Sequence, residues 1–98
     1  MFQHEKNQDG VLVCSFRGRM DADVSNKMEN ELFDVIQKAN APTTFDFKDI
    51  EYISSAFLRI CVKAARAVKG KLRIVNISPQ NYKVLEMTGL HNVFEVQR

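Results

Sequence analysis

Glycine, histidine and cysteine are all scarce in this sequence, and their scarcity limits the chemistry it can carry. The four glycines, at positions 10, 18, 70 and 89, are too scattered for a dinucleotide-binding fingerprint or a phosphate-binding loop. The two histidines stand near the two ends of the chain, and no His-x-x-x-His or Cys-x-x-Cys pair is present to bind a metal ion. We therefore predict no catalytic residue, no metal site and no cofactor, and we expect that the chain is not an enzyme.

The two cysteines, Cys14 and Cys61, both lie in apolar stretches. A reduced cysteine in such surroundings behaves as a small hydrophobic residue. Two cysteines at this spacing do not suggest a disulfide framework. We predict that both belong to the core, with a reactive thiol as the less favoured alternative.

Long apolar runs are also missing. No stretch approaches the roughly 18–20 residues that a membrane helix requires. The first ten residues, MFQHEKNQDG, contain no apolar segment with a small-residue cleavage site. These features predict a cytoplasmic protein that does not insert into a membrane.

The composition of the 98 residues is that of an ordinary globular protein, with 45% apolar and 27% charged side chains. This length is typical of one domain and short for two, so we expect a single domain over residues 1–98. The net charge of +2 is small, and it does not point to direct binding of nucleic acid.

The first half of the chain predicts a hairpin, a helix and a strand. Asp-Gly at positions 9–10 separates two strand-like runs, 2–8 and 11–17, which is a strong hairpin signal. Gly18 is expected to end the second strand, and 19–26 to form a loop. Apolar residues then recur at helical spacing from Met28 until the helix ends before Pro42. The candidate caps of this helix are Asp23, Ser25 and Asn26.

The second half predicts two further helices between strands. A strand at 43–47 is expected to enter a turn at Lys48-Asp49, and Ser54-Ser55 to begin a helix that Gly70 closes. A strand at 71–76, a helix from Ser78-Pro79 to about residue 88 and a last strand at 93–96 follow. Alternating strands and helices predict an α/β fold whose sheet is mixed, with the hairpin at one edge of mostly parallel strands.

Ser54 and Ser55 stand where a strand segment meets a helix. By local chemistry alone, one of these hydroxyls is expected to cap the helix, which is worth about 1 kcal/mol. The positive end of the helix dipole would also tolerate a phosphate, which adds about two negative charges. The two interpretations are compatible with each other.

Four segments, in this order and spacing, make the chain similar to the STAS domain of bacterial anti-sigma factor antagonists. They are Gly18-Arg19-Met20-Asp21-Ala22, residues 45–56, residues 72–79 and Val84-Leu85-Glu86-Met87-Thr88-Gly89-Leu90. The resemblance implies a mixed sheet with helices packed mainly on one face. It also implies partner switching, in which the unphosphorylated domain binds an anti-sigma factor that is often itself a serine kinase. Phosphorylation of a serine then breaks this complex, and a phosphatase restores it.

The family motif Asp-Ser-Ser/Thr-Gly-Leu places the implied phosphoacceptor at Ser55, with Ser54 as the second choice. Ser54 stands where the motif has aspartate, and Phe57 where it has glycine. Phe57 is expected in the core, with an exposed anchor at an interface as the alternative. The partner-binding residues implied by the resemblance are Asp21, Ser54, Ser55, Ala56, Phe57, Leu58 and Arg59.

Two of these assignments have plain structural alternatives. Asp21 is as well explained as a capping or turn residue. Arg59, Lys63 and Arg66 lie at helical spacing and are expected to form a solvated basic face, with docking to an acidic partner as the alternative.

The leading hypothesis is therefore an anti-sigma factor antagonist whose partners are an anti-sigma factor or serine kinase and a serine phosphatase. The family suggests that the free domain is monomeric. A second hypothesis is an interaction module that scaffolds a signalling or lipid-transport complex independently of phosphorylation. A third and weaker one is a domain that binds a small ligand or nucleotide.

Overall fold

The computed structural model describes residues 2–97. They form a mixed five-stranded sheet with strand order β1-β2-β3-β4-β5, in which β1 is antiparallel to β2 and every later pair is parallel. The elements, in chain order, are β1 (Phe2–Lys6), β2 (Leu12–Met20), α1 (Ala22–Ala39), β3 (Thr43–Ile53), α2 (Ser55–Ala67), β4 (Leu72–Val75), α3 (Pro79–Met87), the 3₁₀ helix η1 (Leu90–Asn92) and β5 (Glu95–Gln97).

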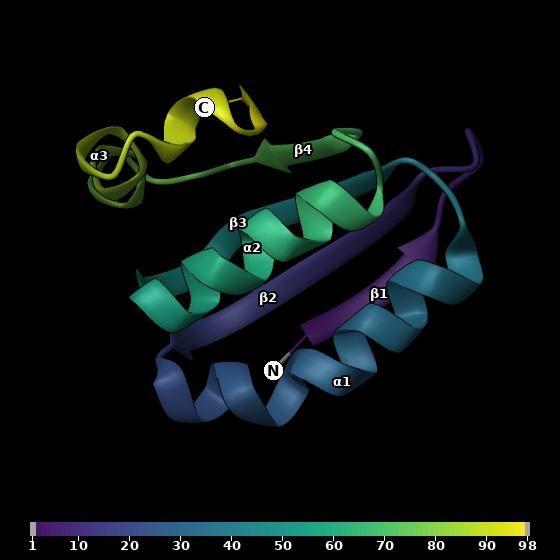
Figure 1. Cartoon of the computed structure of the whole chain (residues 1–98), viewed down its shortest axis with the longest axis horizontal. Helices are drawn as coiled ribbons and strands as arrows, with labels where there is room; N and C mark the ends of the chain where they lie inside the picture. Colours follow the sequence, from purple (N-terminus) through teal and green to yellow (C-terminus); the bar gives the residue numbers. More distant parts are fainter. Residues whose placement is uncertain (1, 98) are drawn as a thin grey trace.

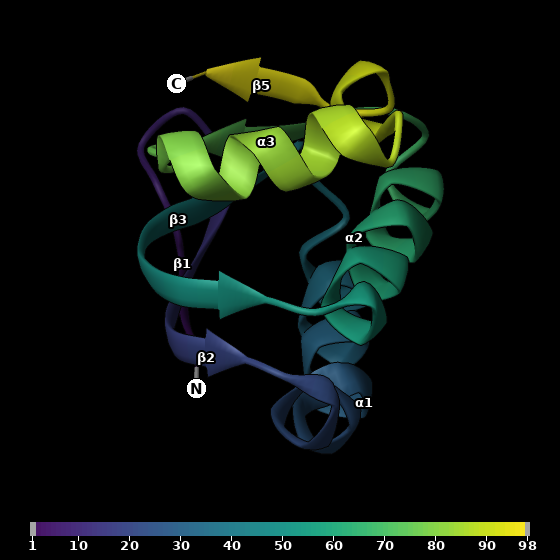
Figure 2. The same ribbon diagram turned by 90° about the vertical axis from the view of Figure 1, so that its left-hand side faces the viewer.

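The two longer helices lie together on one face of the sheet. Figures 1 and 2 show α1 and α2 side by side on this face, and α3 at the end of the sheet towards which β4 points. The hairpin at one edge and the helix-covered face are as the sequence predicts. The third helix also begins as expected, since Ser78 caps it and Pro79 occupies its first turn.

Strands β2 and β3 are longer than the sequence predicts. Gly18 does not end β2, because its φ of +88° is accommodated inside the strand, which continues to Met20. Lys48 and Asp49 likewise lie within β3 and not in a turn. The pairing register shifts twice along this pair, between Ser15 and Arg17 and again between Gly18 and Arg19. Residues typical of turns therefore lie inside a continuous pair of strands, whose register is locally irregular.

The longer β2 also changes the start of α1. The helix begins at Ala22, and its cap is Asp21 instead of Asp23, Ser25 or Asn26. The predicted loop at 19–26 is wrong because residues that looked like a connection belong to the end of a strand and the first turns of a helix. The helix ends at Ala39, before Pro42, as expected.

The core joins the sheet to α2 through a cluster of phenylalanine rings. Phe57 is fully buried, and its ring lies 5.2 Å from that of Phe16 and 5.7 Å from that of Phe47, measured between centroids. Phe45 meets the other side of the cluster, 5.0 Å from Phe16. Edge-to-face contacts at such distances stabilise a core beyond the area they bury. The expectation that Phe57 belongs to the core is confirmed.

No helix within residues 2–97 has the length and apolar character needed to cross a bilayer.

Replacing Phe57 by alanine should lower the free energy of unfolding by about 3–5 kcal/mol, because it opens a cavity in this cluster. Urea denaturation followed by far-UV circular dichroism measures the change. Met87, which is 78% exposed, provides the matched control, and Met87→Ala should change the stability by less than about 0.5 kcal/mol. Equal losses for the two variants would contradict the assignment of Phe57 to the core.

Candidate functional site

The main-chain carbonyl of Met20 joins the two strand ends at which α1 and α2 begin. It accepts one hydrogen bond from the Ser54 N–H, at 3.0 Å, and another from the Ser54 hydroxyl, at 2.8 Å. Met20 is the last residue of β2, and Ser54 follows the last residue of β3. The two helix starts are therefore held next to each other.

Ser54 is the N-cap of α2. Its Oγ accepts a hydrogen bond from the Phe57 N–H at 3.2 Å while donating to Met20. The side chain is half-buried. A hydroxyl whose proton is already donated to a main-chain carbonyl is poorly placed to act as a nucleophile, so the geometry disfavours Ser54, the second choice, as a phosphoacceptor.

Ser55 is the first residue of α2, and its side chain is exposed. Among residues 2–97, none forms a hydrogen bond with its hydroxyl. The first turn of α2 contains no acidic residue, so no carboxylate of that turn offsets the positive end of the helix dipole. Ser55 thus combines an accessible hydroxyl with surroundings that favour a negative charge.

Asp21 lies on the other side of the junction as the N-cap of α1. Its Oδ1 accepts a hydrogen bond from the Val24 N–H at 2.9 Å, and the residue is half-buried. The capping role that the sequence allowed is therefore present. One carboxylate edge is engaged in the cap, and the residue remains partly open to solvent.

Three of the predicted partner-binding residues lie inside the protein. Ala56, Phe57 and Leu58 have relative exposures of 8%, 0% and 6%. Their burial disfavours direct contact between these three side chains and a partner, because α2 turns them towards the interior of the protein. Arg59, the next residue, is exposed. We call the accessible set Asp21, Ser55 and Arg59 the junction surface.

Sequence reasoning missed a pair of residues close to this surface in the chain. The Arg19 guanidinium lies 4.5 Å from the centre of the Tyr52 ring, and the two residues are paired across β2 and β3. Tyr52 is 42% exposed. The sequence contains both a cationic and an aromatic residue here, but only the full length and register of β2 and β3 place Arg19 next to Tyr52.

The basic face predicted on α2 is only partly free. Arg59, Lys63 and Arg66 are all exposed, but the Lys63 Nζ lies 3.0 Å from a carboxylate oxygen of Glu29 on α1 and 4.8 Å from the centre of the Phe33 ring. Lys63 therefore links α2 to α1. Arg59 and Arg66 form no ion pair with any residue from 2 to 97.

The two cysteines are buried, free and poorly suited to react. Burial raises the pKa of the Cys14 thiol to about 12 and raises the pKa of the Cys61 thiol as well. The assignment of both to the core is confirmed. Within residues 2–97 there is also no group of three or more His, Cys, Asp or Glu side chains that could hold a metal ion.

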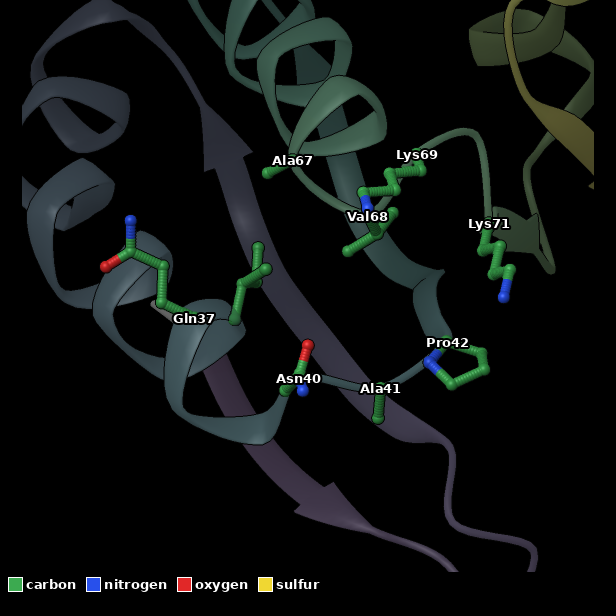
Figure 3. A pocket seen from close by; sticks show the side chains of 9 residues that line it. Gln37, Asn40, Ala41, Pro42, Ala67, Val68, Lys69 and Lys71 are labelled. Atoms are coloured by element: carbon green, nitrogen blue, oxygen red, sulfur yellow. The ribbon is translucent and has the colours of Figure 1, made fainter.

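A hollow with a volume of about 400 Å³ lies at the opposite end of α2 from Ser55. Figure 3 shows it between the last turns of α1 and α2. Its lining residues are Ile36, Gln37, Asn40, Ala41, Pro42, Ala67, Val68, Lys69 and Lys71.

The two serines should respond differently to alanine substitution. Ser54→Ala removes both the cap of α2 and the bond to Met20, and should lower the free energy of unfolding by about 1–2 kcal/mol. Ser55→Ala should change it by less than about 0.5 kcal/mol. Urea denaturation of both variants tests this assignment, and a larger loss for Ser55→Ala would reverse it.

The two thiols should be unreactive in the native protein. Because both pKa values are raised, increasing the pH from about 7 to about 9 should not produce reactive thiolate. Ellman's reagent should label Cys14 and Cys61 only after unfolding in guanidinium chloride. Rapid labelling of either thiol in the native state would contradict their burial.

Comparison with known proteins places this geometry in a family. The model of the STAS domain matches residues 5–98. BtrV of Bordetella bronchiseptica, named as a candidate anti-sigma factor antagonist, is 30% identical over 91 residues, which are 90% of this chain and 78% of BtrV.

Solved structures share the fold. SpoIIAA, an anti-sigma factor antagonist solved in its unphosphorylated form, superposes with a TM-score of 0.81 at 17% identity, over 100% of this chain and 89% of that one. An anti-sigma factor antagonist from Mycobacterium paratuberculosis gives a TM-score of 0.85 at 22% identity, over 98% of this chain and 83% of that one. From its family match and its relation to BtrV, the chain belongs to the STAS domain family.

Proposed function

We propose that this protein is an anti-sigma factor antagonist that binds an anti-sigma factor through the junction surface and is released when Ser55 is phosphorylated. The observation that carries the proposal is the exposed hydroxyl of Ser55 at the start of α2, with which no residue from 2 to 97 forms a hydrogen bond. The half-buried Asp21 caps the adjacent start of α1. The similarity to BtrV supports the antagonist role. SpoIIAA, whose fold the chain shares, is known in a phosphorylated form.

The phosphate would come from ATP bound to a serine kinase, which in this proposal is the anti-sigma factor itself. The Ser55 oxygen forms a bond to the γ-phosphorus, the bond to the β-phosphate oxygen breaks, and ADP leaves. The hydroxyl proton passes to a base on the kinase. A phosphatase then hydrolyses the ester with water, releasing inorganic phosphate and restoring the hydroxyl. This protein is a substrate in both steps and not an enzyme.

The surroundings of Ser55 would accept the modification without unfolding the domain. A phosphate brings about two negative charges, which the start of a helix stabilises. Arg59 lies one helical turn further on and is exposed, so it can pair with the new charge. The cap itself depends on Ser54 and stays intact. Phosphorylation would therefore change the charge of the binding surface while the core remains as it is.

The buried neighbours support this surface from beneath. Ala56 and Leu58 face inward on α2, and Phe57 anchors the first turn to the phenylalanine cluster. They hold Ser55 and Arg59 in place instead of contacting the partner. The proposal places the protein in the cytoplasm, where sigma factors act.

One observation favours a second function. Ser54 stands where a carboxylate would adjoin the phosphoacceptor, and its hydroxyl is engaged in the cap. A kinase that recognises its substrate through such a carboxylate would lack that contact at position 54. The alternative is an interaction module that scaffolds a signalling or lipid-transport complex without being phosphorylated.

Incubation with the cognate serine kinase and ATP, followed by peptide mass mapping, separates the two functions. The antagonist proposal expects phosphate on Ser55, its loss in Ser55→Ala and its retention in Ser54→Ala. Ser55→Asp should weaken binding to the anti-sigma factor at least about tenfold in isothermal titration calorimetry. Tight binding without phosphorylation, unchanged by Ser55→Asp, would overturn the switch and support the scaffold.

A further inference from the structure

The segment from Ser55 to Lys71 carries charge of one sign only. Its five charged residues are all basic, and it contains no aspartate or glutamate. They are Arg59, Lys63, Arg66, Lys69 and Lys71. The chain as a whole has nearly balanced charges, so this segment concentrates the positive ones.

Neighbouring elements do not neutralise this charge. Lys63 is paired with Glu29, but the other four basic side chains of the segment are exposed and form no ion pair with any residue from 2 to 97. On α1, which packs beside α2, Asp23 and Asp34 pair with lysines of their own helix, while Glu31 forms no ion pair within residues 2–97. We call Arg59, Arg66, Lys69 and Lys71 the basic ridge.

The basic ridge ends at the hollow described above. Lys69 and Lys71 belong to its lining, which contains apolar side chains such as Ile36, Pro42 and Val68 and no acidic residue. Figure 3 shows Val68 facing the hollow from α2, with Asn40 and Ala41 on the side of α1. Such a site suits an apolar side chain flanked by carboxylates.

We infer that the basic ridge and this hollow form a docking site for an acidic segment of the partner protein, with one apolar side chain of that segment in the hollow. The inference rests on the proposed function in that it describes the chemistry of the partner. Helix α2 has 13 residues and is about 20 Å long, which about six residues of extended chain would span. Charge complementarity over this length would raise the association rate and select acidic partners.

A protein segment suits this site better than a nucleic acid or a membrane. Four cations would release few counterions from a phosphate polymer. A phosphate group would pair with Lys69 and Lys71 but would make no use of the apolar part of the lining. That apolar part offers a partner side chain the burial that makes an anchor effective.

If the acidic segment binds along the whole ridge, phosphorylation of Ser55 should lower its affinity only in part. A phosphate one turn before Arg59 competes with the acidic segment for that guanidinium. Lys69 and Lys71 lie at the other end of a helix about 20 Å long, beyond the roughly 8 Å over which exposed charges act at physiological ionic strength. Phosphorylation should therefore weaken the segment's binding without removing it.

Selection of a phage-displayed library of random peptides against the full chain provides a probe that needs no known partner. The selected sequences should be rich in Asp and Glu around an apolar residue. Isothermal titration calorimetry of one synthetic selected peptide should show an affinity that falls as salt rises, and NMR shifts should follow α2 and residues 68–71. Failure to enrich acidic peptides, or shifts centred elsewhere, would overturn the inference.

Charge reversal tests the residues themselves. Lys69→Glu/Lys71→Glu should weaken the peptide about tenfold or more, and Lys69→Gln/Lys71→Gln should weaken it less. Lys83→Glu makes the same reversal at an exposed lysine on α3 and should have no effect. Circular dichroism checks that each variant is folded. The proposal would be contradicted if charge reversal at residue 83 weakened the peptide as much as reversal at the ridge. It would also be contradicted if phosphatidylserine vesicles or RNA bound more tightly than the peptide.

The same variants separate this inference from the function it rests on. If the anti-sigma factor binds the wild-type protein and Lys69→Glu/Lys71→Glu equally well, the docking site is wrong and the antagonist role stands. If the anti-sigma factor does not bind at all while the acidic peptide does, the antagonist role is wrong and the docking site stands.

Discussion

The carbonyl of Met20 is the point on which the candidate site depends. It accepts hydrogen bonds from both the N–H and the hydroxyl of Ser54, and so joins the end of β2 to the start of α2. The same serine caps α2 through the Phe57 N–H. One residue therefore satisfies main-chain groups in two elements that are 34 positions apart in the sequence, which would otherwise be left unpaired at the ends of a strand and a helix.

This arrangement gives the two adjacent serines different roles. Ser54 is structural, because both sides of its hydroxyl are engaged in hydrogen bonds. Ser55 is available, because nothing in the described chain occupies its hydroxyl. A capping serine in place of an acidic residue holds the helix without adding a negative charge at the start of α2, where the helix dipole favours an anion.

Phe57 has a comparable structural role on the inner side of the same turn. Its ring packs between those of Phe16 and Phe47, so the first turn of α2 is anchored to two strands of the sheet. Because this ring, Ala56 and Leu58 are all buried, Ser55 and Arg59 are the exposed residues between positions 55 and 59. Further along α2, Arg59 and Arg66 form no ion pair with any residue from 2 to 97. Two carboxylates of α1 pair within their own helix, and a third binds Lys63.

Sequence alone determined the features that depend on neighbouring residues. The Asp-Gly hairpin, the apolar face of each helix, the Ser78-Pro79 helix start and the role of the serine pair at a helix start follow from short-range chemistry and are present in the structure. Both cysteines and Phe57 could be assigned to the core because apolar surroundings favour burial. Only the tertiary structure decided that Gly18, Lys48 and Asp49 lie inside strands, since their tendency to form turns is overridden by pairing between β2 and β3. That pairing extends β2 to Met20, so that α1 begins directly after Asp21. It also sets the contact of Arg19 with Tyr52 and the hydrogen bonds of Ser54 to Met20, because these join residues from distant parts of the chain.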